Sequence, residues 1–378
     1  MPSAVELLKQ LVSINSVNPD LVPGAAGESE IAGFCGQWLA AQGFEVHRLE
    51  ENKGRPSIVG IAKGNGGGRS LMFNGHIDTV TLAGYDGNAL DPKVESGKIY
   101  GRGSFDMKCG VAAMMVAAAR AAKRGLNGDI LVACVADEEY ASLGTAEVAR
   151  HFKADAAIVT EPSHLELTLA HKGFVWFDVV IEGRAAHGSR PELGIDAIAK
   201  AGHFLVALEA YGQKLLAGPR HAILGTGSVH ASIIKGGEEL SSYPALCRIS
   251  LERRTIPGET GETTENELRA MLDALATSVT DFRYRLERGL ERVPFEAKPD
   301  ELIVATLRAH AKAALGREPK VRGEPFWTDC AILKEAGISS VLFGADGAGA
   351  HAATEWADIE SVETLASILE STAVEFCK

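Results

Sequence analysis

Acidic and histidine side chains follow the ends of several predicted apolar strands in this chain. These side chains are His76, Asp78, Asp137, Glu138, Glu139, Glu161 and His351. Asp106 lies instead in a glycine-rich loop, just before the N-terminus of a predicted helix. Ligands of an α/β sheet bind outside the carboxyl ends of its strands, so we expect these groups to converge at one edge of a sheet.

Two histidines with three or more carboxylates form a ligand set that suits a pair of divalent metal ions. Imidazole and carboxylate both bind zinc, and cobalt or manganese can replace it. A carboxylate can bridge two ions roughly 3.5–4 Å apart, and the pair then activates a shared water. Taken singly, each residue is equally typical of a solvated turn or loop in an α/β protein with scattered surface acids. Their occurrence after separate strands favours a metal centre.

Other motifs with known chemistry are incomplete. The glycine-rich run 64–68 leads into a strand rather than a helix, which predicts a tight turn and not a dinucleotide-binding loop. Gly227-Ser228 lacks the surrounding residues of a nucleophile elbow. No cysteine stands in a motif that marks a nucleophile.

The elements that must position the candidate ligands alternate between strand and helix in the first 170 residues. Strands are predicted over 44–49, 57–62, 70–73, 130–135 and 156–159, and helices over 1–12, 29–42 and 109–124. Strands separated by helices predict an α/β sheet with mostly parallel strands. After Pro294 this pattern returns, with two helices, a strand over 340–343 and a terminal helix.

The pattern differs between residues 173 and 290. The predicted elements are strand 173–182, helix 195–216, strands 227–234 and 245–253, helix 265–276 and strand 282–287. We expect Thr264 to cap the second of these helices, in a capping box with Glu267. The βαββαβ order predicts an α+β, ferredoxin-like domain inserted into an α/β domain formed by residues 1–172 and 291–378.

Composition excludes several classes of protein. Among 378 residues, 46% are hydrophobic and 23% charged, which is typical of a folded protein of two or three domains and not of a disordered chain or coiled coil. The net charge of −12 argues against binding to nucleic acid. No apolar stretch reaches the roughly 18 residues of a membrane span. Residues 1–12 lack the pattern of an export signal and the six cysteines are scattered, so we expect a cytoplasmic protein.

Several of these segments together resemble one family of enzymes. The sequences around His76 (GHIDTV), Asp106 (GRGSFDMK) and Glu138 (DEE) resemble the di-zinc hydrolases that include aminoacylase, acetylornithine deacetylase, succinyl-diaminopimelate desuccinylase and carboxypeptidase G. Further segments fit the family in the same order, namely 161–163, 183–191, 253–258, 328–329 and 350–351. The resemblance covers nearly the whole chain, including the inserted domain.

The resemblance implies two zinc ions per subunit, with cobalt or manganese as substitutes. It implies that Asp106 bridges the two ions. His76 and Glu161 complete one metal site, and Glu139 and His351 complete the other. It further implies that Glu138 is the general base, that Asp78 orients His76, and that the peptide bond between Asp106 and Met107 is cis.

The resemblance also implies roles for the inserted domain, as a dimerisation or lid domain of a homodimer. His187 would reach the active site of the partner subunit and stabilise the oxyanion. Arg254 would bind the substrate carboxylate, and Ser241 stands about where many relatives have a substrate-binding asparagine. The Asp106, Glu139 and Glu161 carboxylates neutralise only three of the four positive charges of two zinc ions, which favours an anionic substrate.

These implications lead to one principal hypothesis on function and two alternatives. We expect hydrolysis of the amide bond of an N-acyl amino acid, by water that Glu138 activates. A carboxypeptidase or dipeptidase of the same family is the first alternative. A binding protein with a relic metal site is the second, and the retention of Glu138 and of every ligand argues against it.

Overall fold

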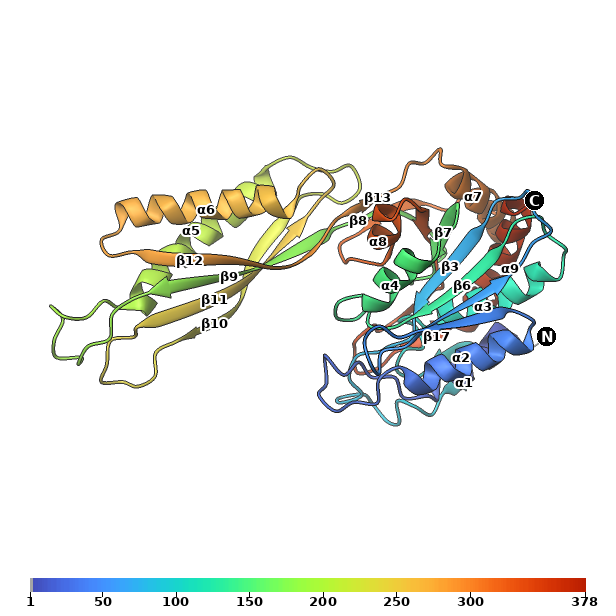
Figure 1. Ribbon diagram of the computed structural model, residues 1–378, viewed down its shortest axis with the longest axis horizontal. Coiled ribbons are helices and arrows are strands. Elements are labelled where there is room, and N and C mark those ends of the chain that lie inside the picture. Colours follow the sequence, from blue (N-terminus) through green and yellow to red (C-terminus); the bar gives the residue numbers. More distant parts are fainter. Residues whose placement is uncertain (1–2) are drawn as a thin grey trace. The chain divides into compact units, whose positions relative to one another are not determined.

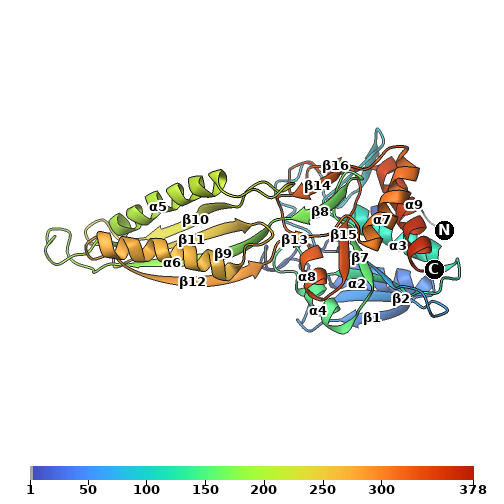
Figure 2. The same ribbon diagram turned by 90° about the horizontal axis from the view of Figure 1, so that it is seen from above.

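The computed structural model describes residues 3–378, which form two compact units (Figures 1 and 2). The first unit contains the described residues up to Leu169, together with Ala297–Arg322 and Thr328–Lys378. The second contains Ala170–Glu296 and Gly323–Trp327. From the sequence we predicted that the inserted domain extends over residues 173–290. That prediction did not include Gly323–Trp327.

The sheet of the first unit is mixed rather than mostly parallel. Its strands follow the order β1 (Glu45–Leu49), β2 (Ser57–Ala62), β6 (Ile130–Val135), β3 (Leu71–His76), β7 (Ala156–Val159), β15 (Ser339–Leu342) and β8 (Leu167–His171). Strands β6, β3, β7 and β15 are parallel, whereas β1, β2 and β8 pair antiparallel. Strand β14 (Val321–Glu324) pairs with β8, which continues into the second unit and pairs there with β13 (Phe295–Glu296). The short β1–β2 connection reverses the chain direction, which excludes parallel pairing.

Helices cover both faces of the parallel strands. Helices α1 (Ala4–Val12), α3 (Lys108–Ala122), α7 (Leu302–Leu315) and α9 (Ile359–Phe376) contact one another, with α3 against β3 and β6. Helices α2 (Ser29–Ala41), α4 (Leu143–His151) and α8 (Cys330–Glu335) contact β2, β6 and β15 respectively. Figure 1 shows α4 and α8 on one side of β3 and β6, with α3 and α9 on the other. Burial on both faces explains why β6 reads as a continuous apolar run.

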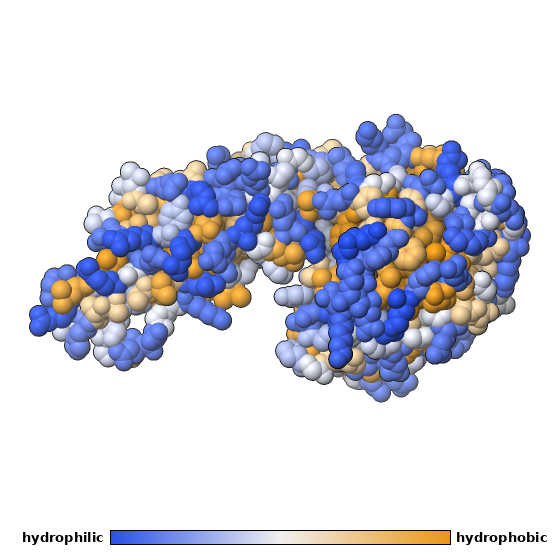
Figure 3. Space-filling model, in the orientation of Figure 1, coloured by the Kyte–Doolittle hydropathy of each residue, from blue (hydrophilic) through white to orange (hydrophobic). Residues whose placement is uncertain are grey.

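The predicted first helix begins at Ala4, because the Ser3 side chain accepts a hydrogen bond from the backbone nitrogen of Glu6 and caps it. The part of that prediction on residues 1 and 2 lies outside the described residues. Across the described residues, no helix combines the length and hydropathy that crossing a bilayer requires. Figure 3 shows hydrophilic residues over most of the visible surface of each unit, with smaller hydrophobic patches between them.

A small sheet in the first unit has no counterpart among the predicted elements. It runs in the order β16 (Gly347–Ala348), β17 (Trp356–Asp358), β5 (Lys98–Tyr100) and β4 (Lys93–Glu95). Strands of two or three residues are too short to show a hydrophobic period. Because β17 pairs with both β16 and β5, the loop after β5 and the loop between β16 and β17 leave from neighbouring strands.

The second unit has the predicted βαββαβ order. Its elements are β9 (Gly173–Glu182), α5 (Ala197–Ala217), β10 (Ser228–Gly236), β11 (Leu246–Thr255), α6 (Gly261–Ser278) and β12 (Arg283–Arg292). The antiparallel sheet has the order β10-β11-β9-β12, which is the ferredoxin-like arrangement. The predicted capping box was wrong: Thr260 caps α6 and pairs with Thr263. Thr264 lies inside the first turn, where its hydroxyl bonds the Thr260 carbonyl.

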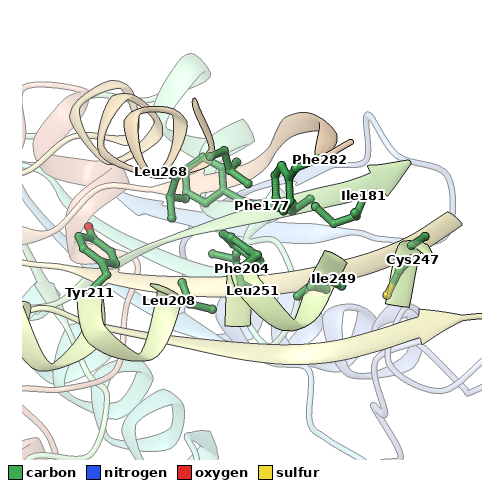
Figure 4. Close-up of a cluster of buried hydrophobic side chains, with 14 of the residues drawn as sticks. Phe177, Ile181, Phe204, Leu208, Tyr211, Cys247, Ile249, Leu251, Leu268 and Phe282 are labelled. Carbon is green, nitrogen blue, oxygen red and sulfur yellow. The ribbon is translucent and has the colours of Figure 1, made fainter. Parts of the chain in front are cut away.

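The core of the second unit lies between its sheet and both helices (Figure 4). Alternate residues of β9, including Phe177 and Ile181, point toward the helices, as the period of two along a strand requires. Phe204 of α5 and Leu268 of α6 meet them there, and both are fully buried. The second unit therefore has a hydrophobic core of its own.

Replacing Phe204 with alanine should lower the free energy of unfolding of the second unit by about 3–5 kcal/mol, because it leaves a cavity in this core. Chemical denaturation followed by circular dichroism measures the change. Asn266→Gln, at an exposed position of α6, is the control and should change stability by less than about 0.5 kcal/mol. Equal effects of the two substitutions would contradict the assignment of this core.

Candidate metal centre

Three neighbouring strands carry candidate ligands at the same edge of the first unit's sheet. His76 is the last residue of β3 and is paired with Val135, the last residue of β6. Glu138 and Glu139 follow β6, and Glu161 follows β7, which is parallel to β3. Because these strands run in one direction, their carboxyl ends bring the four side chains together.

Asp106 and His351 reach the same place from the small sheet. Asp106 lies in the loop after β5, and His351 lies in the loop between β16 and β17. One carboxylate oxygen of Asp106 is 3.3 Å from His76 Nε2, and the other is 3.3 Å from His351 Nε2. Each oxygen of Asp106 thus faces a different histidine, so this carboxylate could contribute one oxygen to each of two metal ions.

The remaining ligand atoms lie around these two histidines. Glu161 Oε1 is 3.4 Å from His76 Nε2, and Glu139 Oε2 is 3.0 Å from His351 Nε2. Glu138 Oε2 is 3.9 Å from His76 Nε2. Ligand atoms of His76, Asp106 and Glu139 lie within 4.8 Å of one another, and so do those of His76, Glu138 and Glu161. The six residues form one cluster with the donor set that zinc, cobalt and manganese accept.

The pKa values of Asp106, His351 and Glu139 differ from their ordinary values. Burial opposes ionisation of Asp106, but hydrogen bonds with His351 and His76 outweigh it and hold the pKa of Asp106 below its ordinary value. Hydrogen bonds with Asp106 and Glu139 raise the pKa of His351 to about 10. Burial and the charge of Asp106 raise the pKa of Glu139 to about 7. The centre stabilises positive charge on its histidines.

The other two carboxylates experience excess negative charge. Burial, followed by the charge of Glu161, raises the pKa of Glu138 well above its ordinary value. The pKa of Glu161 is raised mainly by burial and also by the Asp106 carboxylate, although His76 opposes the shift. Two imidazoles do not neutralise four carboxylates at this density, so this donor set is suited to binding divalent cations.

The two ring nitrogens of His76 have different partners. His76 Nδ1 is 3.0 Å from the backbone oxygen of Asp78 and 3.5 Å from its carboxylate. This contact leaves Nε2 to face the cluster. The Asp78 carboxylate also accepts hydrogen bonds from the backbone nitrogens of Glu138 and Glu139, at 3.1 and 3.2 Å. Asp78 therefore holds the backbone of the segment after β6 as well as the ring of His76.

A buried glutamate that the sequence analysis missed holds the Asp106 loop. Glu355 Oε1 accepts hydrogen bonds from the backbone nitrogens of Phe105 and Asp106, at 3.0 and 2.9 Å. Its Oε2 accepts from the Gly103 nitrogen at 3.0 Å and the Arg102 guanidinium at 2.8 Å. The only feature of the sequence that pointed to Glu355 was its place four residues after His351, a candidate ligand. The bond between Asp106 and Met107 is cis, as the resemblance predicted.

Asp329 is a second buried acid whose role the sequence analysis left open. Its carboxylate accepts a hydrogen bond from the Thr145 hydroxyl at 2.6 Å, and that hydroxyl accepts one from the Asn74 amide at 2.9 Å. Burial is the main cause that raises the pKa of Asp329 to about 6. Asn74 belongs to β3 and Thr145 to α4. These two hydrogen bonds therefore link the strand that carries His76 to the neighbouring helix.

The other candidate residues belong to the second unit. His187 is exposed, and its Nδ1 contacts the Ser189 hydroxyl at 2.8 Å. The Gly188 nitrogen donates to the Ser241 carbonyl at 2.6 Å, so the segments that carry His187 and Ser241 lie side by side. Arg254, near the end of β11, bonds Glu252 through Nε at 2.6 Å. Its guanidinium lies 5.3 Å from the centre of the Phe174 ring.

Residues 72–375 match Peptidase family M20/M25/M40, and the chain therefore belongs to this family of metal-dependent hydrolases. It is a hydrolytic enzyme that acts on amide bonds.

Among relatives, an acetylornithine deacetylase of Myxococcus xanthus is 28% identical, over 100% of this chain and 98% of the relative. An acetylornithine deacetylase of Vibrio vulnificus is 30% identical, over 72% of this chain and 73% of the relative. The crystal structure of aminopeptidase PepT from Bacillus cereus covers 100% of this chain and 98% of its own, with a TM-score of 0.82 and 19% identity. That structure shares the fold.

Replacing Glu355 with glutamine should weaken zinc binding by roughly 10–100-fold, the usual effect of losing a residue that orients ligands. An amide offers one acceptor oxygen and turns a donor toward the backbone nitrogens of the Asp106 loop. Titration of the metal-free protein with zinc against a chelating indicator measures the affinity. Glu360→Gln, an exposed position five residues later, is the control and should bind zinc as the unmodified protein does. Unchanged affinity in Glu355→Gln would contradict the role of this contact.

Proposed function

We propose that this enzyme hydrolyses the amide bond of an N-acyl amino acid. The observation that carries the proposal is the Glu138 carboxylate, which is 12% exposed beside the ligand cluster and 3.9 Å from His76 Nε2. A carboxylate with a raised pKa at such a site suits both removal and return of a proton. The relatives named acetylornithine deacetylase support the deacylase assignment.

The proposed metal assignment follows the distances. His76 and Glu161 would bind one ion, Glu139 and His351 would bind the other, and Asp106 would bind both. Zinc is the proposed ion, with cobalt or manganese as substitutes. Glu138 is the base and not a ligand in this assignment, although its oxygen lies close enough to those of the cluster to bind an ion.

The proposed chemistry divides between the ions and the chain. Two divalent ions, when bound, polarise the scissile carbonyl and make water acidic enough to lose a proton near neutral pH. Glu138 accepts that proton as the water oxygen bonds to the carbonyl carbon. Glu138 then donates the proton to the amine nitrogen as the carbon–nitrogen bond breaks, which releases a carboxylic acid and an amino acid. Asp78 keeps Glu138 in place through its hydrogen bond to the Glu138 backbone nitrogen.

The proposed substrate is anionic. Two divalent ions carry +4, and the carboxylates of the three acidic ligands carry −3, so the loaded centre is positive. Arg254 is the proposed carboxylate-binding residue. Its bond to Glu252 uses Nε, so the two terminal nitrogens keep the geometry that binds a carboxylate through two hydrogen bonds. Ser241 is proposed to lie near the substrate because its segment adjoins that of His187.

We also propose that the enzyme is a homodimer formed through the second unit. Strand β10 is an edge of its sheet, and most of its residues are exposed. Ile233 on this strand is 53% exposed and Val206 on α5 is 70% exposed, which is unusual for large apolar side chains unless a partner covers them. A second copy of β10 would pair with this edge. His187 of each chain then serves the active site of the partner subunit.

A substrate panel distinguishes the proposed function from its alternative. Zinc-loaded enzyme should release amino acid from N-acetyl or N-succinyl amino acids faster than it cleaves dipeptides. Release of the amine is measured with an amine-reactive dye. Preference for dipeptides would overturn the deacylase in favour of a carboxypeptidase or dipeptidase, which the same metal centre can support.

Replacing Glu138 with glutamine should lower kcat by more than about 10²-fold while both zinc ions stay bound, because it removes the base and keeps the ligands. Turnover and zinc content are measured on the same sample. Glu139→Gln provides the contrast, because it removes a proposed ligand and should lose zinc as well as activity. Near-normal turnover in Glu138→Gln would show that another group is the base.

Replacing His187 with alanine should lower kcat by about 10²–10³-fold without loss of zinc, as expected when an oxyanion donor is removed. His151→Ala, an exposed histidine of the first unit, should leave turnover unchanged. Mixing the His187→Ala and Glu138→Ala proteins tests the contribution across subunits. The mixed dimer has one site with both residues intact, so activity should partly return. No recovery after proven subunit exchange, or full activity in a monomer, would contradict the dimer.

A further inference from the structure

Asn18 lies in the segment after α1, and its side chain is fully buried. Its amide nitrogen donates one hydrogen bond to Asp78 Oδ2 at 2.8 Å and another to Asp137 Oδ1 at 3.0 Å. Its amide oxygen accepts a hydrogen bond from the Asp20 backbone nitrogen at 2.9 Å. Ionised carboxylates only accept and a backbone N–H only donates, so these partners determine which end of the amide is nitrogen.

Asp78 transmits this contact to the metal centre. Its two carboxylate oxygens accept hydrogen bonds from the backbone nitrogens of Glu138 and Glu139, and Oδ1 lies 3.5 Å from His76 Nδ1. A shift of the Asp78 carboxylate therefore moves the proposed base and two proposed ligands together. The hydrogen bonds of the Asn18 side chain go to Asp78, Asp137 and the Asp20 backbone nitrogen, and to none of those three residues.

Asp137 is the second residue that Asn18 holds. It directly precedes Glu138 and has a φ of 71°, in the left-handed region that few residues other than glycine adopt. Its Oδ1 accepts a hydrogen bond from Arg55 at 2.6 Å in addition to the one from Asn18. Arg55 is 8% exposed and also bonds both oxygens of the buried Glu28. One amide and one guanidinium thus hold Oδ1 of Asp137, at the backbone turn that carries Glu138.

The charges of this network explain why an amide stands at position 18. Asp78, Asp137 and Glu28 are buried carboxylates, and Arg55 contributes one positive charge to the network. Buried carboxylates require donors or cations. An amide between Asp78 and Asp137 supplies two donors without adding charge. Aspartate at the same position has nearly the same shape, but it adds a further negative charge to the network and removes both donors.

We propose that Asn18 is a positioning residue of the metal centre, and that Arg55 supports it through Asp137. The Asn18 amide ties Asp78 to Asp137 and so sets the backbone that carries Glu138 and Glu139. The expected effect on turnover rests on the proposed function, whereas the expected effect on metal binding does not. Asn18 contributes through the geometry of other residues and takes no part in the proton transfers.

The test uses Asn18→Asp, Asn18→Ser and the control Asn15→Asp. Asn15 lies three residues earlier, and its side-chain oxygen accepts only a local hydrogen bond from the Val17 nitrogen. An aspartate there keeps that acceptor, so the control adds the same charge without breaking the network. Zinc titration against a chelating indicator gives the affinity of each folded protein, and thermal unfolding of the metal-free proteins gives the stability.

We expect Asn18→Asp to weaken zinc binding by about 10–100-fold. At saturating zinc, kcat on the best N-acyl amino acid should fall by a similar factor, and KM should change by less than about threefold. Asn18→Ser keeps one donor and should show a smaller loss in the same two quantities. Asn15→Asp should match the unmodified protein in both.

Three results separate the possibilities. If folded Asn18 variants bind zinc as tightly as the unmodified protein and lose only thermal stability, Asn18 is merely structural and the proposal is wrong. If Asn18→Asp does not fold, the zinc affinity and kcat of Asn18→Ser decide in the same way. If the unmodified protein hydrolyses neither N-acyl amino acids nor dipeptides, the proposed function fails, while the zinc affinities still decide the role of Asn18.

Discussion

The crowding of carboxylates at one edge of the first unit's sheet is the constraint on which the rest of this structure depends. Asp106, Glu138, Glu139 and Glu161 converge on two histidines because parallel strands end there and two loops reach the same place. Like charges held this closely in a buried site repel one another. Bound cations between the carboxylates would offset this repulsion, and hydrogen bonds from buried residues hold the segments that carry Asp106, Glu138 and Glu139.

The supporting hydrogen bonds come from parts of the chain far apart in sequence. Glu355 holds the loop of Asp106, and Asp78 holds the backbone of Glu138 and Glu139. Asn18 connects Asp78 to Asp137. Asp106, Glu138 and Glu139 are therefore each fixed through a second residue, Glu355 or Asp78, which is itself buried and hydrogen-bonded. Rigid support of this kind reduces the reorganisation that a catalytic centre requires during reaction.

The two units contribute different parts of the proposed chemistry. The first unit contains the whole ligand cluster and Glu138, whereas His187, Ser241 and Arg254 belong to the second. The second unit has its own hydrophobic core. Its exposed edge strand and exposed apolar side chains are the features that support the proposal of a dimer.

Sequence by itself determined the class of the elements and the set of candidate ligands. Long strands and helices have readable periods, and the predicted βαββαβ order is the one observed. His76, Glu139 and Glu161 were predictable because each follows a buried strand, and the family match agrees with the resemblance that assigned them. The sequence did not determine strand direction, since parallel and antiparallel strands can share one apolar pattern, and it misplaced the cap of α6.

Tertiary structure alone decided how those ligands are held. Strands such as β16 and β17 are too short to have a period, yet they bring the loop of His351 beside that of Asp106. Asn18 and Asp137 are 119 positions apart. No local pattern in the sequence indicates that the Asn18 amide lies between the carboxylates of Asp78 and Asp137. Local patterns follow from the geometry of a single element, whereas a buried polar network exists only once packing has removed water from its members.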